Sequence, residues 1–219
     1  MELSFHVEYK MIDNQEQLLK EGKMLPVMEH FYTIQGEGAH TGKAAYFIRL
    51  GGCDVGCHWC DVKESWDPKI HPLLDVEQVA DTAANQCKTI VLTGGEPLMW
   101  NLDFLTEKLK ERGCTIHIET SGAYPMSGTL DWITLSPKKT GLPLEEIYQK
   151  AHELKMIIFN QNDFKFAQEQ AEKVSQNCRL YLQSEWGKRE VMYPKITDFI
   201  LENPQWQASV QTHKYLNIP

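Results

Sequence analysis

Residues 53–60 read CDVGCHWC, so Cys53, Cys57 and Cys60 follow one another at C-x3-C-x2-C spacing. They come directly after the apolar run 44–50, AAYFIRL, which predicts a strand that ends where the cysteines begin. A loop leaving a strand can turn all three thiols inward, and thiolates are the ligands that iron–sulfur clusters and zinc prefer. Structural zinc sites are normally closed by four ligands. Three local thiols therefore predict a metal centre with an open position.

Two other interpretations of these thiols stay open at this point. His58 or a remote side chain could complete a zinc knuckle, or two thiols could form a disulfide and leave the third free. The other cysteines, Cys87, Cys114 and Cys178, stand singly among apolar neighbours. This is typical of reduced core thiols in a cytoplasmic protein and favours a metal centre over disulfides.

Length and composition indicate one soluble globular domain. The chain has 219 residues, 42% hydrophobic and 24% charged, and no apolar run approaches the roughly 20 residues of a membrane-spanning helix. Its first residues, MELSFH, lack the basic flank and apolar core of a secretory signal. The net charge is -8 without a Lys/Arg cluster, so we expect neither nucleic acid nor membranes as partners. Arg49, Lys138 and Lys139 could still bind a small anion.

After the cysteines, short apolar runs alternate with amphipathic stretches, the pattern of parallel strands joined by helices. We expect strands at residues 89–93, 115–120, 132–135, 155–158, 179–183 and 207–211. We expect helices at residues 75–85, 102–112, 144–154, 164–176 and around 197–203. With the strand before the cysteines, this makes six or seven parallel strands, fewer than the eight of a closed TIM barrel. The sequence therefore predicts an α/β fold, an incomplete TIM barrel of about six parallel strands.

Glycine and hydroxyl motifs follow the predicted strands at their carboxyl ends, where parallel α/β sheets bind ligands. They are Thr93-Gly94-Gly95-Glu96-Pro97, Glu119-Thr120-Ser121-Gly122 and Ser136-Pro137-Lys138. The bare backbone of a Gly-Gly turn can hydrogen-bond the amino and carboxylate groups of a ligand, and Lys138 offers a compact positive charge. Taken singly, these motifs also fit ordinary turns and loop caps. Together they predict one ligand-binding mouth beside the cysteines.

The cysteine spacing, with the aromatic Trp59 before the third cysteine, resembles the hallmark of the radical S-adenosylmethionine (SAM) superfamily. The resemblance implies a [4Fe-4S] cluster held by Cys53, Cys57 and Cys60, whose fourth iron is chelated by SAM. It also implies SAM contacts from the Gly-Gly-Glu-Pro motif and from later strand ends. The residues concerned are Gly94, Gly95, Glu96, Gly122, Ser136, Pro137, Lys138 and Gln183.

Four further stretches narrow the family: residues 33–38 (TIQGEG), 47–50 (FIRL), 60–61 (CD) and 211–219 (QTHKYLNIP). They are similar to those of 7-carboxy-7-deazaguanine synthases, small radical SAM enzymes of queuosine and 7-deazapurine biosynthesis. The resemblance implies a pterin substrate, held by a turn, an arginine, a strand end and the last residue. The residues concerned are Ile34, Gln35, Gly36, Arg49, Thr93 and Pro219.

The same resemblance covers most of the chain from about Met28 onward. We therefore expect residues 24–219 to be a single radical SAM domain whose C-terminal tail contributes to the substrate pocket. Residues 1–23 are then an N-terminal extension of unknown role, in which residues 13–21 could form a short helix that Gly22 ends.

The implied activity is conversion of 6-carboxy-5,6,7,8-tetrahydropterin to 7-carboxy-7-deazaguanine with loss of ammonia, through a 5′-deoxyadenosyl radical. The resemblance also implies an external electron donor such as flavodoxin or ferredoxin, and a homodimer. Family members bind Mg²⁺ through a threonine or serine two residues after the third cysteine, where this chain has Val62. Binding of Mg²⁺ would then depend on Asp61, Ser65, or substrate and water oxygens.

Two other functions stay open. A glycyl-radical activase carries the same cysteine motif in a chain of similar size but acts on a partner protein. A non-catalytic iron–sulfur or zinc-binding module would hold a metal without turnover. We assign no side chain as a general acid or base.

Overall fold

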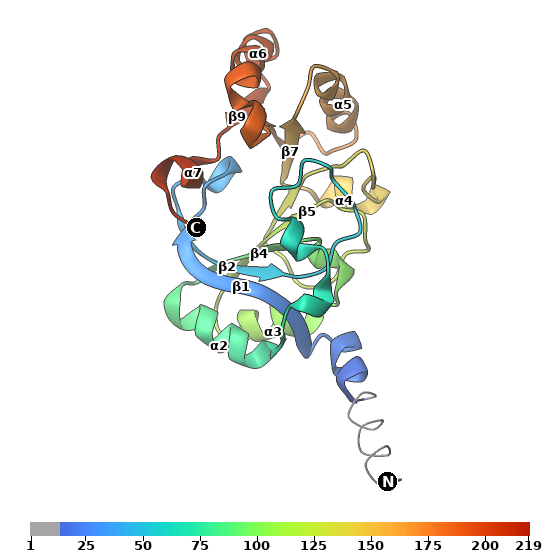
Figure 1. The fold of residues 1–219 in the computed structure, drawn as a ribbon, viewed down its shortest axis with the longest axis vertical. Helices are drawn as coiled ribbons and strands as arrows, with labels where there is room; N and C mark the ends of the chain where they lie inside the picture. The colour runs from blue at the N-terminus through green and yellow to red at the C-terminus, as the bar shows by residue number, and fades with distance from the viewer. Residues whose placement is uncertain (1–13) are drawn as a thin grey trace.

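The fold is built on a nine-stranded sheet with the strand order β3-β1-β2-β4-β5-β6-β7-β8-β9 (Figure 1). The computed structural model describes residues 14–219. The strands are β1 (Met24–Ile34), β2 (Ala44–Leu50), β3 (Leu73–Asp75), β4 (Thr89–Gly94), β5 (Thr115–Thr120), β6 (Trp132–Leu135), β7 (Glu153–Ile158), β8 (Arg179–Ser184) and β9 (Trp206–Ser209).

Strand direction confirms the predicted class of fold. Within residues 14–219, the seven strands β2 and β4 to β9 run parallel, while β1 and β3 extend one edge in antiparallel pairing. Eight parallel strands would be needed to close a TIM barrel. The prediction of an incomplete barrel is therefore confirmed, with the strand count at the upper end of the expected six or seven.

Helices connect the parallel strands, and a last short helix follows β9 (Figure 1). They are α2 (Val76–Gln86), α3 (Asp103–Glu111), α4 (Glu145–Lys150), α5 (Asn162–Ala171), α6 (Arg189–Glu202) and α7 (Thr212–Leu216). In α2 the carboxylate of Asp75 accepts a hydrogen bond from the Gln78 amide at 3.1 Å, which caps the first turn. The residues of α2 at helical spacing from Val76 to Ala84 are buried, as their periodicity predicts.

Three predicted helices have clearly different bounds in the structure. The helix expected over residues 164–176 runs from Asn162 to Ala171. The helix expected over residues 144–154 ends at Lys150, because the chain that follows pairs with β6 and β8 as the start of β7. The helix expected around 197–203 begins earlier, at Arg189, and contains Pro194. Proline lacks the amide hydrogen that residues in a helix interior donate, so its presence disfavours a helix in the sequence. The predicted helix therefore began only after Pro194.

The expected N-terminal extension lies partly outside the described residues, which begin at residue 14. Residues 14–20 are helical, and Gly22 follows at φ 68°, so the predicted stop is confirmed. Within residues 14–219, every helix is too short or too polar to cross a membrane.

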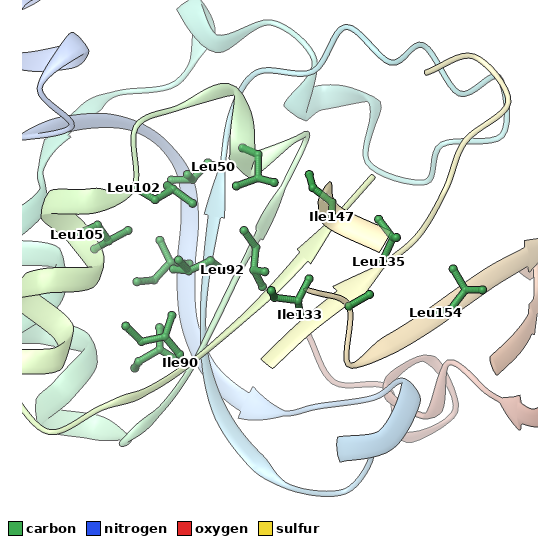
Figure 2. Close-up of a cluster of buried hydrophobic side chains, with 14 of the residues drawn as sticks. Leu50, Ile90, Leu92, Leu102, Leu105, Ile133, Leu135, Ile147 and Leu154 are labelled. Atoms are coloured by element: carbon green, nitrogen blue, oxygen red, sulfur yellow. The ribbon is translucent and has the colours of Figure 1, made fainter. Parts of the chain in front are cut away.

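The core lies between the sheet and its helices, and it fixes the strand ends that carry the motifs. Figure 2 shows part of it, with Leu50, Ile90, Leu92, Leu102, Leu105, Ile133, Leu135, Ile147 and Leu154 labelled. All nine side chains are buried. Complete burial of an aliphatic side chain of this size contributes about 1.5–3 kcal/mol, so the core forms a rigid base for the loops beyond the strands.

Candidate active site

A pocket of about 420 Å³ opens at the carboxyl ends of the parallel strands, a volume typical of small-molecule sites. Strand ends of β2, β4, β5 and β8 form part of its wall. The rest comes from the cysteine loop (residues 53–60), the hairpin turn between β1 and β2 (residues 35–43) and the C-terminal tail (residues 211–219). Segments far apart in the sequence thus meet where barrel folds bind ligands.

Most of the residues predicted from sequence meet in this pocket. The ones that line it are Ile34, Gln35, Gly36, Arg49, Cys53, Cys57, Cys60, Val62, Thr93, Gly94, Gly95, Glu96, Ser136, Lys138, Gln183 and Pro219. Gly122 and Pro137 do not line it. A Cβ on Gly122 would meet the side chains of Leu135 and Pro143, so Gly122 packs behind the wall.

The cysteine loop is held by backbone contacts that leave its thiols available. The amide of Gly52 donates to the Ser65 carbonyl at 2.6 Å, and that of Cys53 to the Trp66 carbonyl at 3.1 Å. All six cysteines are free, so the disulfide interpretation is wrong. Burial raises the pKa of Cys53 and of Cys57, and the Lys138 ammonium opposes this rise at Cys57.

The donor set fits an iron–sulfur cluster. The three thiols line one pocket, yet no three His, Cys, Asp or Glu side chains within residues 14–219 stand close enough together to hold one ion. Three thiols that line one pocket without converging on a point suit a cluster, because the cysteine sulfurs bound to a cluster lie farther apart than those bound to one zinc ion. Ligation itself deprotonates a thiol, so the raised pKa values do not prevent binding.

The two glycines at the carboxyl end of β4, Gly94 and Gly95, allow the cysteine loop to pack against that strand. The amide of Gly95 donates to the Leu50 carbonyl at 2.9 Å. A Cβ on Gly95 would lie 2.3 Å from the Gly52 oxygen and 2.7 Å from the Cβ of Cys53. The Gly-Gly turn is therefore required by the approach of the loop, whatever else it binds.

Glu96 links the ends of β4 and β5. It is buried, and its carboxylate accepts from the Leu98 amide at 3.0 Å, the Thr120 hydroxyl at 2.5 Å and both the amide and the hydroxyl of Ser121. Four donors occupy both oxygens, so this side chain holds the pocket wall together.

Lys138 brings a positive charge to the cysteine loop. Its ammonium donates to the Ser136 hydroxyl at 2.6 Å and lies 5.7 Å from the centroid of the Trp59 ring. Burial lowers the pKa of Lys138, partly opposed by the nearby Cys57. An anionic group entering the pocket would find this ammonium already oriented.

The hairpin turn and Arg49 each have an ordinary structural role in addition to their place in the pocket wall. Gln35 exchanges backbone hydrogen bonds of 2.8 Å with Lys43 and Gly42, which makes an ordinary hairpin, and it also lines the pocket. Arg49 pairs through Nε with Glu29 at 2.7 Å and lines the pocket as well. The surface ion pair therefore coexists with a place in the wall.

The C-terminal tail docks onto the pocket through polar contacts, whereas its Tyr215 and Leu216 side chains are exposed. The Thr212 amide donates to the Gly36 carbonyl at 2.9 Å, and the Thr33 hydroxyl donates to the Pro219 carbonyl at 3.4 Å. Lys214 donates to Asp61 at 2.8 Å, next to the third cysteine. The tail thus bridges the hairpin turn and the cysteine loop.

Val62 and Ser65 bear on the magnesium site. Val62 lines the pocket, but Ser65 does not. Ser65 is fully buried and its hydroxyl donates to the Val62 carbonyl at 2.7 Å. Ser65 is therefore wrong as a substitute ligand, whereas Asp61 does line the pocket.

Three charged residues of the wall, Glu37, Glu119 and Lys155, received no individual role from the sequence, although Glu37 and Glu119 stand in two of the quoted motifs. Burial disfavours the Glu37 carboxylate, but the Lys155 ammonium outweighs it and lowers the pKa of Glu37 to about 2. Burial likewise opposes ionisation of Lys155, while Glu119 and Glu37 together raise its pKa. The available signal was a lysine inside an apolar strand, since a lysine is rarely buried without a partner.

Comparison with known proteins identifies the family. The radical SAM superfamily profile matches residues 47–160. A 7-carboxy-7-deazaguanine synthase of Flavobacterium psychrophilum is 60% identical over 201 residues, 92% of this chain and 96% of that protein. The chain belongs to the 7-carboxy-7-deazaguanine synthase family.

Other family members agree with this identification. A 7-carboxy-7-deazaguanine synthase of Synechocystis is 50% identical over 88% of this chain and 93% of its own length. The crystal structure of QueE from Escherichia coli superposes with a TM-score of 0.77 at 28% identity, over 90% of this chain and 98% of that chain. Membership in the radical SAM superfamily implies a [4Fe-4S] cluster and SAM.

Proposed function

We propose that this chain converts 6-carboxy-5,6,7,8-tetrahydropterin to 7-carboxy-7-deazaguanine with loss of ammonia. The observation that carries the proposal is the pocket that joins three free cysteines, the Gly-Gly turn and the docked tail. It occurs in a chain 60% identical to a 7-carboxy-7-deazaguanine synthase. Radical chemistry at a cofactor requires a site that orients cofactor and substrate and excludes competing reactions.

In this proposal Cys53, Cys57 and Cys60 hold the cluster. When bound, the cluster and SAM would supply the radical chemistry that the conversion needs at C6 of the substrate. The chain itself orients the ligands and excludes water. The residues proposed for SAM are the wall residues Gly94, Gly95, Glu96, Ser136, Lys138 and Gln183, with Gly122 and Pro137 supporting them from behind.

Ile34, Gln35, Gly36, Arg49, Thr93 and Pro219 are proposed to bind the pterin. Arg49→Ala should raise the Kd for the carboxypterin by roughly 10- to 100-fold, because a charged hydrogen bond contributes about 1.5–3 kcal/mol. Calorimetry without reductant measures this, with SAM affinity as the internal reference. Glu29→Gln, which removes only the negative charge of the outer partner of Arg49, serves as the control. An unchanged pterin Kd in Arg49→Ala would remove this residue from the site.

Mg²⁺ is proposed as a cofactor that this chain uses less strictly than its relatives, since Val62 offers no oxygen ligand. Turnover of the wild type should be stimulated only weakly in a Mg²⁺ titration, and Val62→Thr should show clear stimulation at lower Mg²⁺ concentration. Identical titration curves for the two proteins would show that residue 62 does not contact the metal.

We further propose an external one-electron donor such as flavodoxin or ferredoxin, a homodimer and a cytoplasmic location. Residues 24–219 are proposed to be one domain, supported by the continuous sheet from β3 to β9. An incomplete barrel leaves a sheet edge that a second copy could cover.

Anaerobic turnover tests the proposed function. Reconstituted protein given SAM, reductant and the carboxypterin should release a product with the mass and absorbance of 7-carboxy-7-deazaguanine. Radical formation only on a large protein partner would establish the activase instead. A colourless protein with one zinc per chain would establish a metal-binding module.

A further inference from the structure

A buried lysine completes a ring of polar side chains in the pocket wall. Lys155 on β7 is 5% exposed. Its ammonium donates to Glu37 and lies 3.7 Å from Glu119. The Glu37 amide donates to the Gln35 side-chain oxygen at 3.0 Å, and the Gln35 side-chain nitrogen donates to Glu119 at 3.0 Å. These four residues, here called the Lys155 ring, join the hairpin turn to β5 and β7.

The charges of the Lys155 ring make its geometry dependent on the lysine. One ammonium stands between two carboxylates, and all three groups line the pocket. A buried charge is strongly disfavoured unless it is paired. Without Lys155, the carboxylates of Glu37 and Glu119 would repel each other, and one of them would have to turn away or become protonated.

The ring also holds the C-terminal tail. The second oxygen of Glu37 accepts a hydrogen bond from the side chain of Gln211 at 3.0 Å. The adjacent Thr212 donates to the Gly36 carbonyl, one residue before Glu37 in the hairpin turn. Displacement of Glu37 would therefore displace the tail as well, and with it Pro219, which lines the pocket.

We propose that Lys155 is a positioning residue for the substrate, which fixes Glu37 and Glu119 in the wall and, through Glu37, fastens the C-terminal tail over the pocket. The inference rests on the proposed function, because it assigns the Lys155 ring to the pterin side of the site. The hairpin turn and the tail belong to that side. Among the residues proposed for SAM, Gln183 also reaches Glu37, whereas Gly94, Gly95 and Ser136 form no hydrogen bond with the ring within residues 14–219.

Lys155→Met tests this role in the reconstituted enzyme with SAM and without reductant, so that binding is measured in the absence of turnover. The Kd for the carboxypterin should rise at least about tenfold, the Kd for SAM should stay within about twofold, and hydrogen exchange of residues 211–219 should accelerate. Lys155→Arg keeps the charge and should recover part of the pterin affinity. Lys165→Met, at a lysine whose side chain is 84% exposed, should behave as wild type.

The dependence on pH separates positioning from simple loss of structure. The charged and titratable groups around Glu37 are Lys155, Glu119, Glu153, Asp61, His213 and Lys214. In the wild type Glu37 stays ionised between about pH 5 and 8, because its pKa is about 2. In Lys155→Met, the ammonium that lowers the pKa of Glu37 is absent, so burial raises this pKa. Protonation of Glu37 at lower pH would remove its repulsion from Glu119, so the loss of pterin affinity relative to wild type should be smaller at low pH than at high pH. The titration of His213 is common to both proteins.

The double variant Lys155→Met/Glu37→Gln removes the unpaired carboxylate, so it should fold even where the single variant does not, and still bind the pterin weakly. Wild-type pterin affinity in either variant, or an equal loss of SAM and pterin affinity, would overturn the proposal. Wild-type protein that binds SAM but not the carboxypterin would overturn the proposed function, and with it this inference.

Discussion

Cys57→Ala is expected to lose essentially all turnover and most of its iron while keeping the fold. The residue lies in the middle of the cysteine loop, outside the core, and is only half-buried. Removing one of three thiolate ligands leaves a four-iron cluster with two protein ligands, which is too few for stable assembly. Iron content, colour after anaerobic reconstitution, turnover and thermal unfolding by circular dichroism measure the effect.

Cys87→Ala provides the matched control. Its thiol lies outside the pocket wall, accepting from the Thr89 amide at 3.4 Å and donating to the Ala44 carbonyl at 3.7 Å. Loss of such a weak contact costs about 1 kcal/mol of stability or less. Iron content and turnover should match the wild type. Turnover retained by Cys57→Ala would refute the assignment of the cluster ligands.

Gly95→Ala should reduce SAM affinity at least tenfold, about 1.4 kcal/mol, and also lower the iron content. Its added methyl group would lie 2.3 Å from the Gly52 oxygen. That neighbour is backbone and cannot swing away, so the loop that begins at Cys53 has to move. Overpacking of this kind typically costs about 1–3 kcal/mol, and here the displacement falls on the cluster ligands.

Gly141→Ala is the corresponding control, since the nearest atom to its added Cβ is a Val55 methyl carbon at 3.5 Å, an ordinary contact. Equilibrium dialysis with SAM and an iron assay on both variants measure the difference. Equal SAM binding by Gly95→Ala and the wild type would show that the strand-end glycines do not control the site.

The sequence predicted the barrel well because its parallel strands are short apolar runs with clear boundaries. Residues 115–120 and 132–135 match β5 and β6. Predictions failed where tertiary context outweighed local pattern. The first half of α6 was not predicted as helix because it contains Pro194. The helix predicted to residue 154 ends at Lys150, because the residues that follow pair with neighbouring strands as β7.

The candidate site was predictable in part for a related reason. Cysteines and paired glycines have characteristic spacings along the chain, so the cysteine loop and the Gly-Gly turn could be found. The Lys155 ring joins residues 35, 37, 119 and 155, which have no fixed spacing. These residues come together only in the tertiary fold, where β5, β7 and the hairpin turn meet.

The most direct test of the account is electron paramagnetic resonance of the reduced, anaerobically reconstituted protein, recorded with and without SAM. The account predicts about four irons per chain and a cluster spectrum that SAM alters, because SAM binds the iron that no cysteine holds. A spectrum that SAM leaves unchanged, or a protein that contains zinc and no cluster, would contradict it.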